Sequence, residues 1–263
     1  MKLAVIGGGN MGGAIAFGAI AQGVVEAQSV AVSHLSEKMK PLFEPYIKEL
    51  KSDDCNQTVI EDADLIILAV KPWLVEEVLE EIVCKIDRTR QSLISVVAGL
   101  SFAQMAQMLR FEELGAMPLY RVIPNTAISI GEGVSIISSC GTTPQLDTLV
   151  VELFESLGAT FVVEEVMMTP LTSLSSCGIA FALRYLDASM RGGAEVGIDS
   201  ATSLEVTLKT MEGAVAMLRR NGSLPQSEID KVTTKGGITL KGLEAMEREG
   251  FSKSVVCAIK ESR

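Results

Sequence analysis

The chain has 263 residues, of which 48% are hydrophobic and 21% charged, and its formal net charge is −10. This composition argues against long disordered stretches, and an acidic balance with no cluster of lysines and arginines argues against a nucleic-acid partner. Five scattered cysteines and a single histidine show no metal-ligand spacing, so we expect no metal and a reduced, cytoplasmic protein. No apolar run approaches the length of a membrane span, so no membrane partner is expected.

Short apolar runs alternate with helical segments through the first part of the chain. We predict strands at 2–6, 29–33, 64–70, 92–98, 119–123, 134–138 and 159–163, and helices at 14–23, 75–86, 102–109 and 144–157. The segment 37–51 is predicted as a helix that Pro41 and Pro45 interrupt. Strands that alternate with helices indicate βαβ crossovers and a mainly parallel sheet.

After about Glu165 helical periodicity takes over, in 167–196, 200–220, 238–249 and 252–260. We therefore predict an α/β Rossmann-like dinucleotide-binding domain at 1–164, followed by an all-α C-terminal domain at 165–263. The segment 174–188 is apolar on most of its circumference, which is typical of a helix buried on all sides. A partner subunit is the natural covering, so we expect a homo-oligomer, a dimer or higher, through the C-terminal helices. The alternative is burial by neighbouring helices of the same chain.

The run Gly7-Gly8-Gly9-Asn10-Met11-Gly12 follows the first strand directly and fits the pattern G-x-G-x-x-G. Gly7 permits a tight turn, Gly9 lets the backbone approach a pyrophosphate, and Gly12 lets the helix pack closely on the strand. The free N–H groups that open the helix, at Asn10 and Met11, attract phosphate. The pattern predicts dinucleotide binding, and the alternative is a glycine-rich turn without a ligand.

The end of the second strand bears on which dinucleotide binds. Sites for NAD usually place an acid there on the ribose, whereas this chain offers Ser33, Ser36 and Lys38 to a 2′-phosphate. NADPH is therefore favoured, and Glu37 keeps NADH open. His34, the only histidine, lies at the adenosine end, more than about 10 Å from hydride transfer by the length of a dinucleotide. Lactate-type dehydrogenases, which need a histidine acid, are disfavoured.

Further motifs follow in order along the chain. They are Asn56, Ala69-Val70-Lys71-Pro72, Val97-Ala98-Gly99, Arg121-Val122-Ile123-Pro124-Asn125-Thr126 and Val232-Thr233-Thr234-Lys235-Gly236-Gly237-Ile238-Thr239. With the glycine run they resemble the pyrroline-5-carboxylate reductases, the last enzymes of proline synthesis, over nearly the whole chain. The resemblance implies that Asn56 contacts the adenine side of the cofactor. It also implies that the ends of two strands line the cofactor, at Ala69, Val70, Lys71, Pro72, Val97 and Ala98. The alternative for residues 69–72 is a plain strand terminator.

The segment Gly236-Gly237-Ile238-Thr239 opens a helix, and free N–H groups there make a site for a small carboxylate. The resemblance implies that Gly237, Ile238 and Thr239 hold the substrate carboxylate, and that the Thr239 hydroxyl is catalytic, bonding the ring nitrogen. It also places Glu165 near the substrate. The alternatives are a threonine helix cap and a surface glutamate.

The reaction that the resemblance implies is reduction of 1-pyrroline-5-carboxylate to L-proline by NADPH. The chain departs from the family around the substrate, where Ile179, Lys235 and Ala127 each replace a proline. Two other functions therefore stay open. One is a hydroxyacid dehydrogenase of the 6-phosphogluconate type, for which Lys209 is the nearest acid–base candidate. The other is a cofactor-binding paralogue without catalysis.

Overall fold

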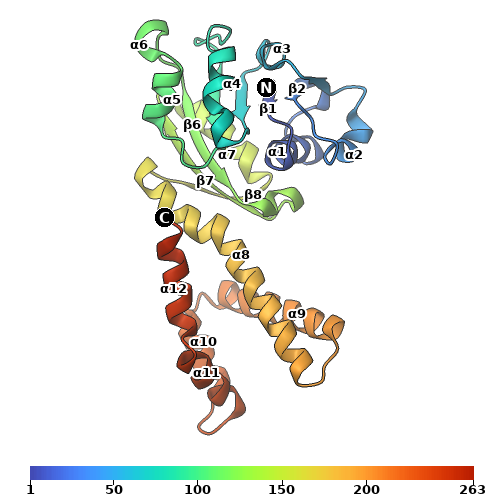
Figure 1. The fold of residues 1–263 in the computed structure, drawn as a ribbon, viewed down its shortest axis with the longest axis vertical. Coiled ribbons are helices and arrows are strands. Elements are labelled where there is room, and N and C mark those ends of the chain that lie inside the picture. Colours follow the sequence, from blue (N-terminus) through green and yellow to red (C-terminus); the bar gives the residue numbers. More distant parts are fainter. The chain divides into compact units, whose positions relative to one another are not determined.

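The computed structural model describes all 263 residues, in two compact units (Figure 1). The N-terminal unit, Met1–Ser176, combines strands and helices, and the C-terminal unit, Cys177–Arg263, is entirely helical. This is the predicted succession of an α/β Rossmann-like part and an all-α part, and the fold class is confirmed.

Eight strands form one sheet in the N-terminal unit, in the order β3-β2-β1-β4-β5-β6-β7-β8. Their bounds are β1 Leu3–Ile6, β2 Val30–Ser33, β3 Lys51–Asp53, β4 Leu65–Leu68, β5 Ser92–Ser95, β6 Leu119–Pro124, β7 Gly133–Cys140 and β8 Gly158–Val162. Every neighbouring pair is parallel except β6 with β7, which is antiparallel. The carboxyl ends of β1, β2, β4 and β5 therefore meet at one edge, and this edge holds the glycine run.

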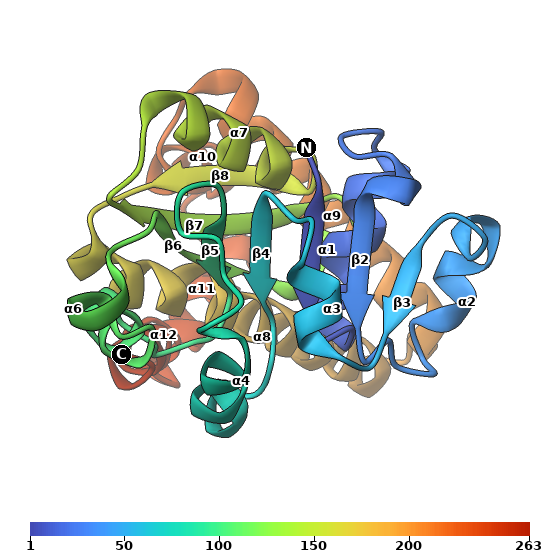
Figure 2. The ribbon, with the colours of Figure 1, turned by 90° about the horizontal axis from the view of Figure 1, so that it is seen from above.

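Helices cover both faces of this sheet (Figure 2). The helices are α1 Asn10–Ala21, α2 Lys40–Phe43, α3 Asn56–Ile60, α4 Val75–Ile82, α5 Phe102–Met108, α6 Phe111–Leu114 and α7 Pro144–Glu155. Leu3 and Val5 share a hydrophobic core with α1 and α7, whereas Ala4 and Ile6 share the other core with α3, α4 and α5. Because successive side chains of a strand point to opposite faces, β1 is apolar at every position, as the sequence predicts for a strand buried on both sides.

The predicted helix at 37–51 is wrong. The segment holds only the short helix α2 and a 3-10 turn, Glu44–Tyr46, with Pro41 and Pro45 each in a first turn, and it ends in the strand β3. Proline is compatible with a first helical turn but not with a continuous helix through both positions. The strand β3 is short, polar and mostly exposed, so it carries no hydrophobic pattern.

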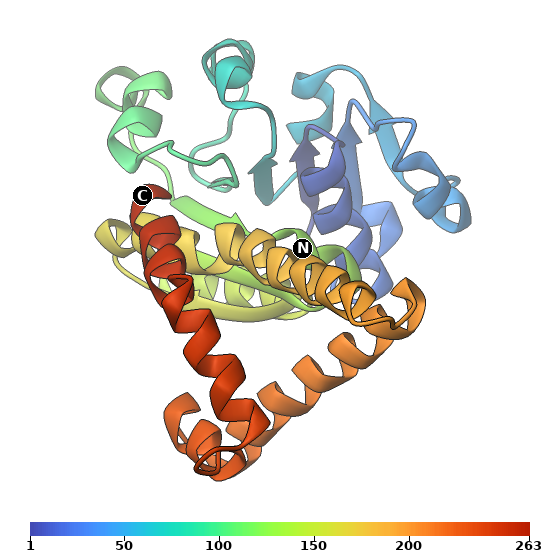
Figure 3. The same ribbon diagram turned by 60° about the horizontal axis from the view of Figure 1, so that its bottom comes forward.

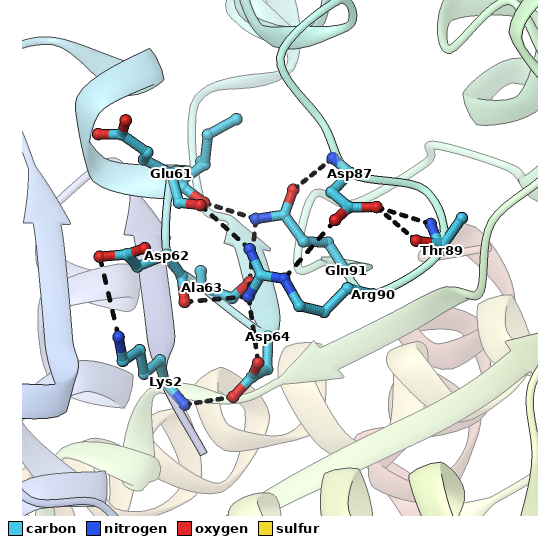
Figure 4. A network of polar contacts seen from close by, with 10 residues as sticks. Lys2, Glu61, Asp62, Ala63, Asp64, Asp87, Thr89, Arg90 and Gln91 are labelled. Atoms are coloured by element: carbon cyan, nitrogen blue, oxygen red, sulfur yellow. Dashed lines mark hydrogen bonds and ion pairs between the residues drawn. The ribbon is translucent and has the colours of Figure 1, made fainter.

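A polar network lies at the amino ends of β1, β4 and β5, at the opposite end of these strands from the glycine run (Figure 4). Arg90 Nη1 donates to the carbonyl oxygens of Asp62 and Ala63 at 3.1 and 2.8 Å. The buried Gln91 amide donates to the oxygens of Ile60 and Ala63 at 2.5 and 2.9 Å. These bonds satisfy carbonyls that the end of α3 leaves free, as buried backbone groups require.

The helix α8, Glu165–Glu195, belongs to both units. Its first turns pack on the sheet, where Met168 joins Ile123 and Ile136 in a small core. The division between the units consequently falls within α8, after Ser176, and later in the chain than the change from strands to helices at residue 165.

The C-terminal unit contains the rest of α8 and four more helices, α9 Ser200–Asn221, α10 Pro225–Val232, α11 Ile238–Arg248 and α12 Phe251–Glu261 (Figure 3). Helices α8 and α9 approach closely, since a Cβ added to Gly193 would lie 2.2 Å from Ser203 Oγ. No hydrophobic residue after Met168 is buried, and large apolar side chains such as Leu183 and Val206 are 59% and 60% exposed. The single chain therefore leaves its C-terminal helices without a core.

One helix, α8, has the length and composition to cross a membrane, with a mean hydropathy of 1.5 over an 18-residue window. This corrects the expectation that no apolar run approaches such a length. The core helix of a soluble protein passes the same test, so composition alone does not assign α8 to a membrane.

A nearly buried carboxylate holds together the loop between α9 and α10. Glu228 Oε1 accepts hydrogen bonds from Lys231 Nζ, Ser223 Oγ and Asn221 Nδ2 at 2.7, 2.5 and 3.2 Å. The bond from Lys231, followed by those from Ser223 and Asn221, lowers the pKa of Glu228 from 4.5 to about 2.

Glu228→Gln is expected to lower the Tm at neutral pH, because the charged form makes the stronger bonds. A pKa depressed in the folded state stabilises the fold above the unfolded value of 4.5, and this contribution is lost as the pH falls from 4.5 towards about 2. The difference in Tm between wild type and variant should shrink over that interval. Glu244→Gln, at an exposed position on α11, is the control. A difference that does not depend on pH would contradict the assignment.

Candidate dinucleotide and carboxylate sites

The turn after β1 has the shape that the glycine pattern predicts. Gly7 has a φ of +98°, a value that favours glycine, and a Cβ there would lie 2.7 Å from the oxygen of Ala69. A Cβ on Gly12 would lie 2.2 Å from the oxygen of Gly7. The turn and the close approach of α1 therefore both require glycine.

Gly9 differs from these two residues because a Cβ added there would meet nothing within 4 Å. It is the N-cap of α1, in an extended conformation, with no side-chain cap and no acidic residue in the first turn. The first helical hydrogen bond runs from the Gly13 amide to the Gly9 oxygen at 2.8 Å. The amides of Asn10, Met11 and Gly12 precede this bond and have no acceptor within the helix, and the space beside Gly9 is open, so the residues present fit a bound diphosphate.

The predicted lining segments lie at the same edge of the sheet. The Ala69 amide donates to the Ile6 oxygen at 2.8 Å, which continues the pairing of β1 with β4. The Val96 amide likewise donates to the Leu68 oxygen at 3.0 Å. This bond continues the pairing of β4 with β5, so the ends of both strands lie at the same edge of the sheet. Residues 69–72 therefore lie beside the glycine turn, and residues 97–98 lie one strand further along the sheet. Lys71, Pro72 and Ala98 are exposed, and Val97 is buried.

Ser33 has a different place from the one expected. It is fully buried, and its hydroxyl accepts a hydrogen bond from the Gly7 amide at 3.2 Å. This corrects the expectation that the Ser33 hydroxyl is open to a 2′-phosphate, because the side chain supports the glycine turn instead. Ser36 is partly exposed, and its amide donates to the Gly8 oxygen at 3.0 Å.

The charges at the end of β2 favour an added phosphate. Glu37, the acid that kept NADH open, pairs with Lys40 at 2.5 Å, which leaves Lys38 exposed and without an ion pair. His34 has a φ of +51°, and its Nδ1 lies 3.5 Å from Asp54 Oδ1. Sequence reasoning missed Asp54, because the short polar strand β3 that brings it beside His34 was not predicted.

Asn56 begins α3 and is 4% exposed. Its Nδ2 donates to Glu81 Oε2 at 2.7 Å, whereas its Oδ1 is buried without a hydrogen-bond partner. The Cys55 thiol is exposed beside it, and hydrogen bonds from Thr58, first from its side chain, lower the pKa of Cys55. An acceptor without a donor is costly when buried, so Asn56 Oδ1 is suited to receive a donor from a ligand.

A cavity of about 540 Å³ opens beside the start of α1. Its polar lining includes Asn10, Lys38, Thr126 and Ser129 around an apolar floor that includes Met11 and Phe17. Two of the predicted cofactor residues, Asn10 and Met11, therefore border a space of the size that small-molecule sites have.

The motif at residues 121–126 holds the first turns of α8. Arg121 is buried, and its Nη1 donates to Glu165 Oε1 at 2.7 Å, which also accepts from the Phe102 amide at 2.8 Å. Asn125 Nδ2 donates to the Ser175 oxygen at 3.3 Å. Glu165 is thus an anchored carboxylate whose side chain is 38% exposed. Its predicted role at the substrate stays a prediction.

The predicted carboxylate site lies in the C-terminal unit, at the start of α11. Gly237 is the N-cap, without a side-chain cap, and the first turn holds no acidic residue. The first helical bond runs from Lys241 to the Gly237 oxygen at 3.3 Å, which leaves the amides of Ile238 and Thr239 free. The alternative that Thr239 caps this helix is wrong, because the cap position belongs to Gly237. The Thr239 side chain is exposed and available to a ligand.

Two family models match the chain. Residues 165–263 match the model described as pyrroline-5-carboxylate reductase dimerisation, and residues 2–99 match the model described as NADP oxidoreductase coenzyme F420-dependent. The pyrroline-5-carboxylate reductase of Glycine max is 31% identical over 268 residues, which cover 99% of this chain and 94% of that protein. Its counterpart in Arabidopsis thaliana is 30% identical and covers 100% and 94%.

Solved structures agree with these relatives. The Plasmodium falciparum pyrroline carboxylate reductase with NADP bound has a TM-score of 0.89 and 26% identity, and covers 100% of this chain and 95% of that one. The Streptococcus pyogenes 1-pyrroline-5-carboxylate reductase has a TM-score of 0.86 and 29% identity, and covers 100% and 96%. Matches of this length and identity extend over both units, so the chain belongs to the pyrroline-5-carboxylate reductase family.

Proposed function

We propose that the protein reduces 1-pyrroline-5-carboxylate to L-proline with NADPH, as a step of proline and hence amino-acid biosynthesis. The observation that carries the proposal is the glycine turn with open space at Gly9 and unused amides at the start of α1. It occurs in a chain that aligns from end to end with enzymes of this name. The NADP in the Plasmodium falciparum structure supports the choice of cofactor.

When bound, the reduced nicotinamide supplies the hydride, which goes to the ring carbon of the C=N bond. The nitrogen carries a proton as the iminium, so the electron pair of the C=N bond ends on nitrogen and yields the secondary amine. The amides of Asn10, Met11 and Gly12 hold the diphosphate, and Asn56, Ser36 and Lys38 face the adenosine half. The segments 69–72 and 97–98 line the cofactor at the sheet edge.

The chain's own residues at the substrate bind and orient. The amides of Ile238 and Thr239 hold the carboxylate, because the Gly237 amide already donates to the Thr234 oxygen at 2.9 Å. The Thr239 hydroxyl bonds the ring nitrogen. Because an iminium is already a good electrophile, proximity and orientation supply most of what the protein must add. This suits a site without a histidine or a paired acid and base.

The hydroxyacid dehydrogenase alternative needs a lysine that can exchange its proton. Lys209 is exposed on α9 and donates to Glu212 Oε2 at 2.7 Å, and this bond raises the pKa of Lys209. A raised pKa opposes acid–base work near neutral pH, so the contact disfavours this function. NADPH oxidation with 1-pyrroline-5-carboxylate, against NADP reduction with 3-hydroxy acids, separates the two. NADPH binding without either reaction would favour the paralogue without catalysis.

We also propose that the protein is a cytoplasmic homo-oligomer whose C-terminal domain begins at residue 165. The absence of any buried apolar side chain after Met168 supports the oligomer, because a second copy would supply the missing core. The match of residues 165–263 to a dimerisation family supports both the partner and the boundary. All five cysteines are free, which is compatible with a reducing compartment. Sedimentation velocity should show a dimer or larger at micromolar concentration, and a folded monomer would contradict this.

A further inference from the structure

The segment before α11 forms a tight turn. The Gly237 amide donates to the Thr234 oxygen at 2.9 Å, and Gly236 has a φ of +77°. A bond between the first and fourth residues with a positive φ at the third is typical of a type II turn, which favours proline at the second position. Lys235 occupies that second position, where the family pattern has proline. The chain forms this turn with a lysine, and not a proline ring, at the second position.

The charge of Lys235 is not paired with an acidic side chain. Its side chain is exposed and forms no ion pair, whereas Lys231, one turn earlier in the chain, pairs with Glu228 at 2.7 Å. The first turn of α11 contains no acidic residue that would neutralise a cation. Lys235 therefore lies in the turn that directly precedes the positive end of the α11 dipole.

We propose that Lys235 is a specificity residue that adds a positive charge to the carboxylate site at the start of α11. The inference rests on the proposed function, which places the substrate carboxylate on the amides of Ile238 and Thr239. A lysine has a flexible four-carbon stem and a compact charge, so it strengthens carboxylate binding without fixing the ring. Exposed pairs of this kind change an affinity by about threefold, and salt screens them.

The test compares Lys235→Ala, Lys235→Pro and Lys235→Arg with wild type, and uses Lys253→Ala on α12 as the control at another exposed, unpaired lysine. The measurements are kcat and KM for 1-pyrroline-5-carboxylate at low and high salt, and the Kd of L-proline in the presence of NADP. We expect KM and Kd to rise about threefold in the alanine and proline variants at low salt. The effect should fall on KM and not on kcat. Arginine and the control should match wild type, and high salt should remove the difference.

1-Pyrroline is a cyclic imine without a carboxylate. It therefore shows whether a loss in a Lys235 variant comes from the missing charge or from a changed turn. Its KM should be the same in wild type and in the alanine and proline variants. Equal KM and Kd values for all variants with the carboxylate ligands would overturn the proposal, and so would an equal loss with 1-pyrroline. If no variant reduces either imine, the proposed function fails, and the Kd of L-proline then decides the role of Lys235 by itself.

Discussion

Replacing Gly9 with alanine is expected to weaken NADPH binding by at least about tenfold, or about 1.4 kcal/mol, and to leave the Tm unchanged. Gly9 has φ −80° and ψ −162°, a conformation that alanine adopts, and the added Cβ meets nothing within 4 Å in the chain. The methyl group would nevertheless stand where a diphosphate approaches the amides of α1. The loss therefore belongs to the ligand and not to the fold.

Gly12→Ala is the matched variant, because its Cβ would lie 2.2 Å from the Gly7 oxygen. We expect it to lower both the Tm and the affinity. Trp73 provides the readout, since it is the only tryptophan, is 77% exposed and directly follows the cofactor-lining segment 69–72. Energy transfer from Trp73 to reduced nicotinamide should quench its emission on titration. Wild-type affinity in Gly9→Ala would show that no diphosphate lies on this turn.

Replacing Thr239 with valine is expected to lower kcat/KM for 1-pyrroline-5-carboxylate by at least about tenfold, or about 1.4 kcal/mol. Valine keeps the branched shape and removes the hydroxyl that would bond the ring nitrogen. Because Gly237 is the N-cap of α11, the exchange removes no helix cap, and the Tm should change little.

Two further variants make the result on Thr239 specific. Thr239→Ser keeps the hydroxyl and should retain most of kcat/KM. Thr210→Val lies on α9, where the threonine hydroxyl bonds only the Val206 oxygen of its own helix, at 2.8 Å, and it should leave kcat/KM unchanged. An unchanged kcat/KM in Thr239→Val would remove this hydroxyl from the mechanism.

The hydrophobic pattern predicts the buried strands and long helices well, because each is apolar at the period of its own structure. Strands β1 and β4 are apolar at every position, and both lie in the middle of the sheet. The pattern fails at β3, whose residues Lys51–Asp53 are polar and mostly exposed. It also fails at α10, whose single buried side chain is the carboxylate Glu228. Strand β3 presents no apolar face, and the eight residues of α10 are too few for the helical period to be distinct.

In the candidate site, too, the sequence predicts local features and misses those that depend on tertiary packing. A local pattern was enough for the glycine turn, because the steric needs of Gly7 and Gly12 act within one strand, one turn and one helix. The place of Ser33 depends on which side of β2 faces that turn, and the sequence predicted it wrongly. The pair of Arg121 with Glu165 joins residues 44 positions apart, and its structural use follows only from tertiary packing.

Hydride transfer from a nicotinamide to the carbon of a cyclic imine can be followed directly with an isotope. NADPH deuterated in the transferred position is incubated with the protein and 1-pyrroline-5-carboxylate, and the products are analysed by mass spectrometry. We expect one L-proline for each NADPH oxidised, with a single deuterium on the ring carbon that was doubly bonded to nitrogen. Oxidation of NADPH without labelled proline, or bound NADPH that is never oxidised, would contradict the proposed reductase.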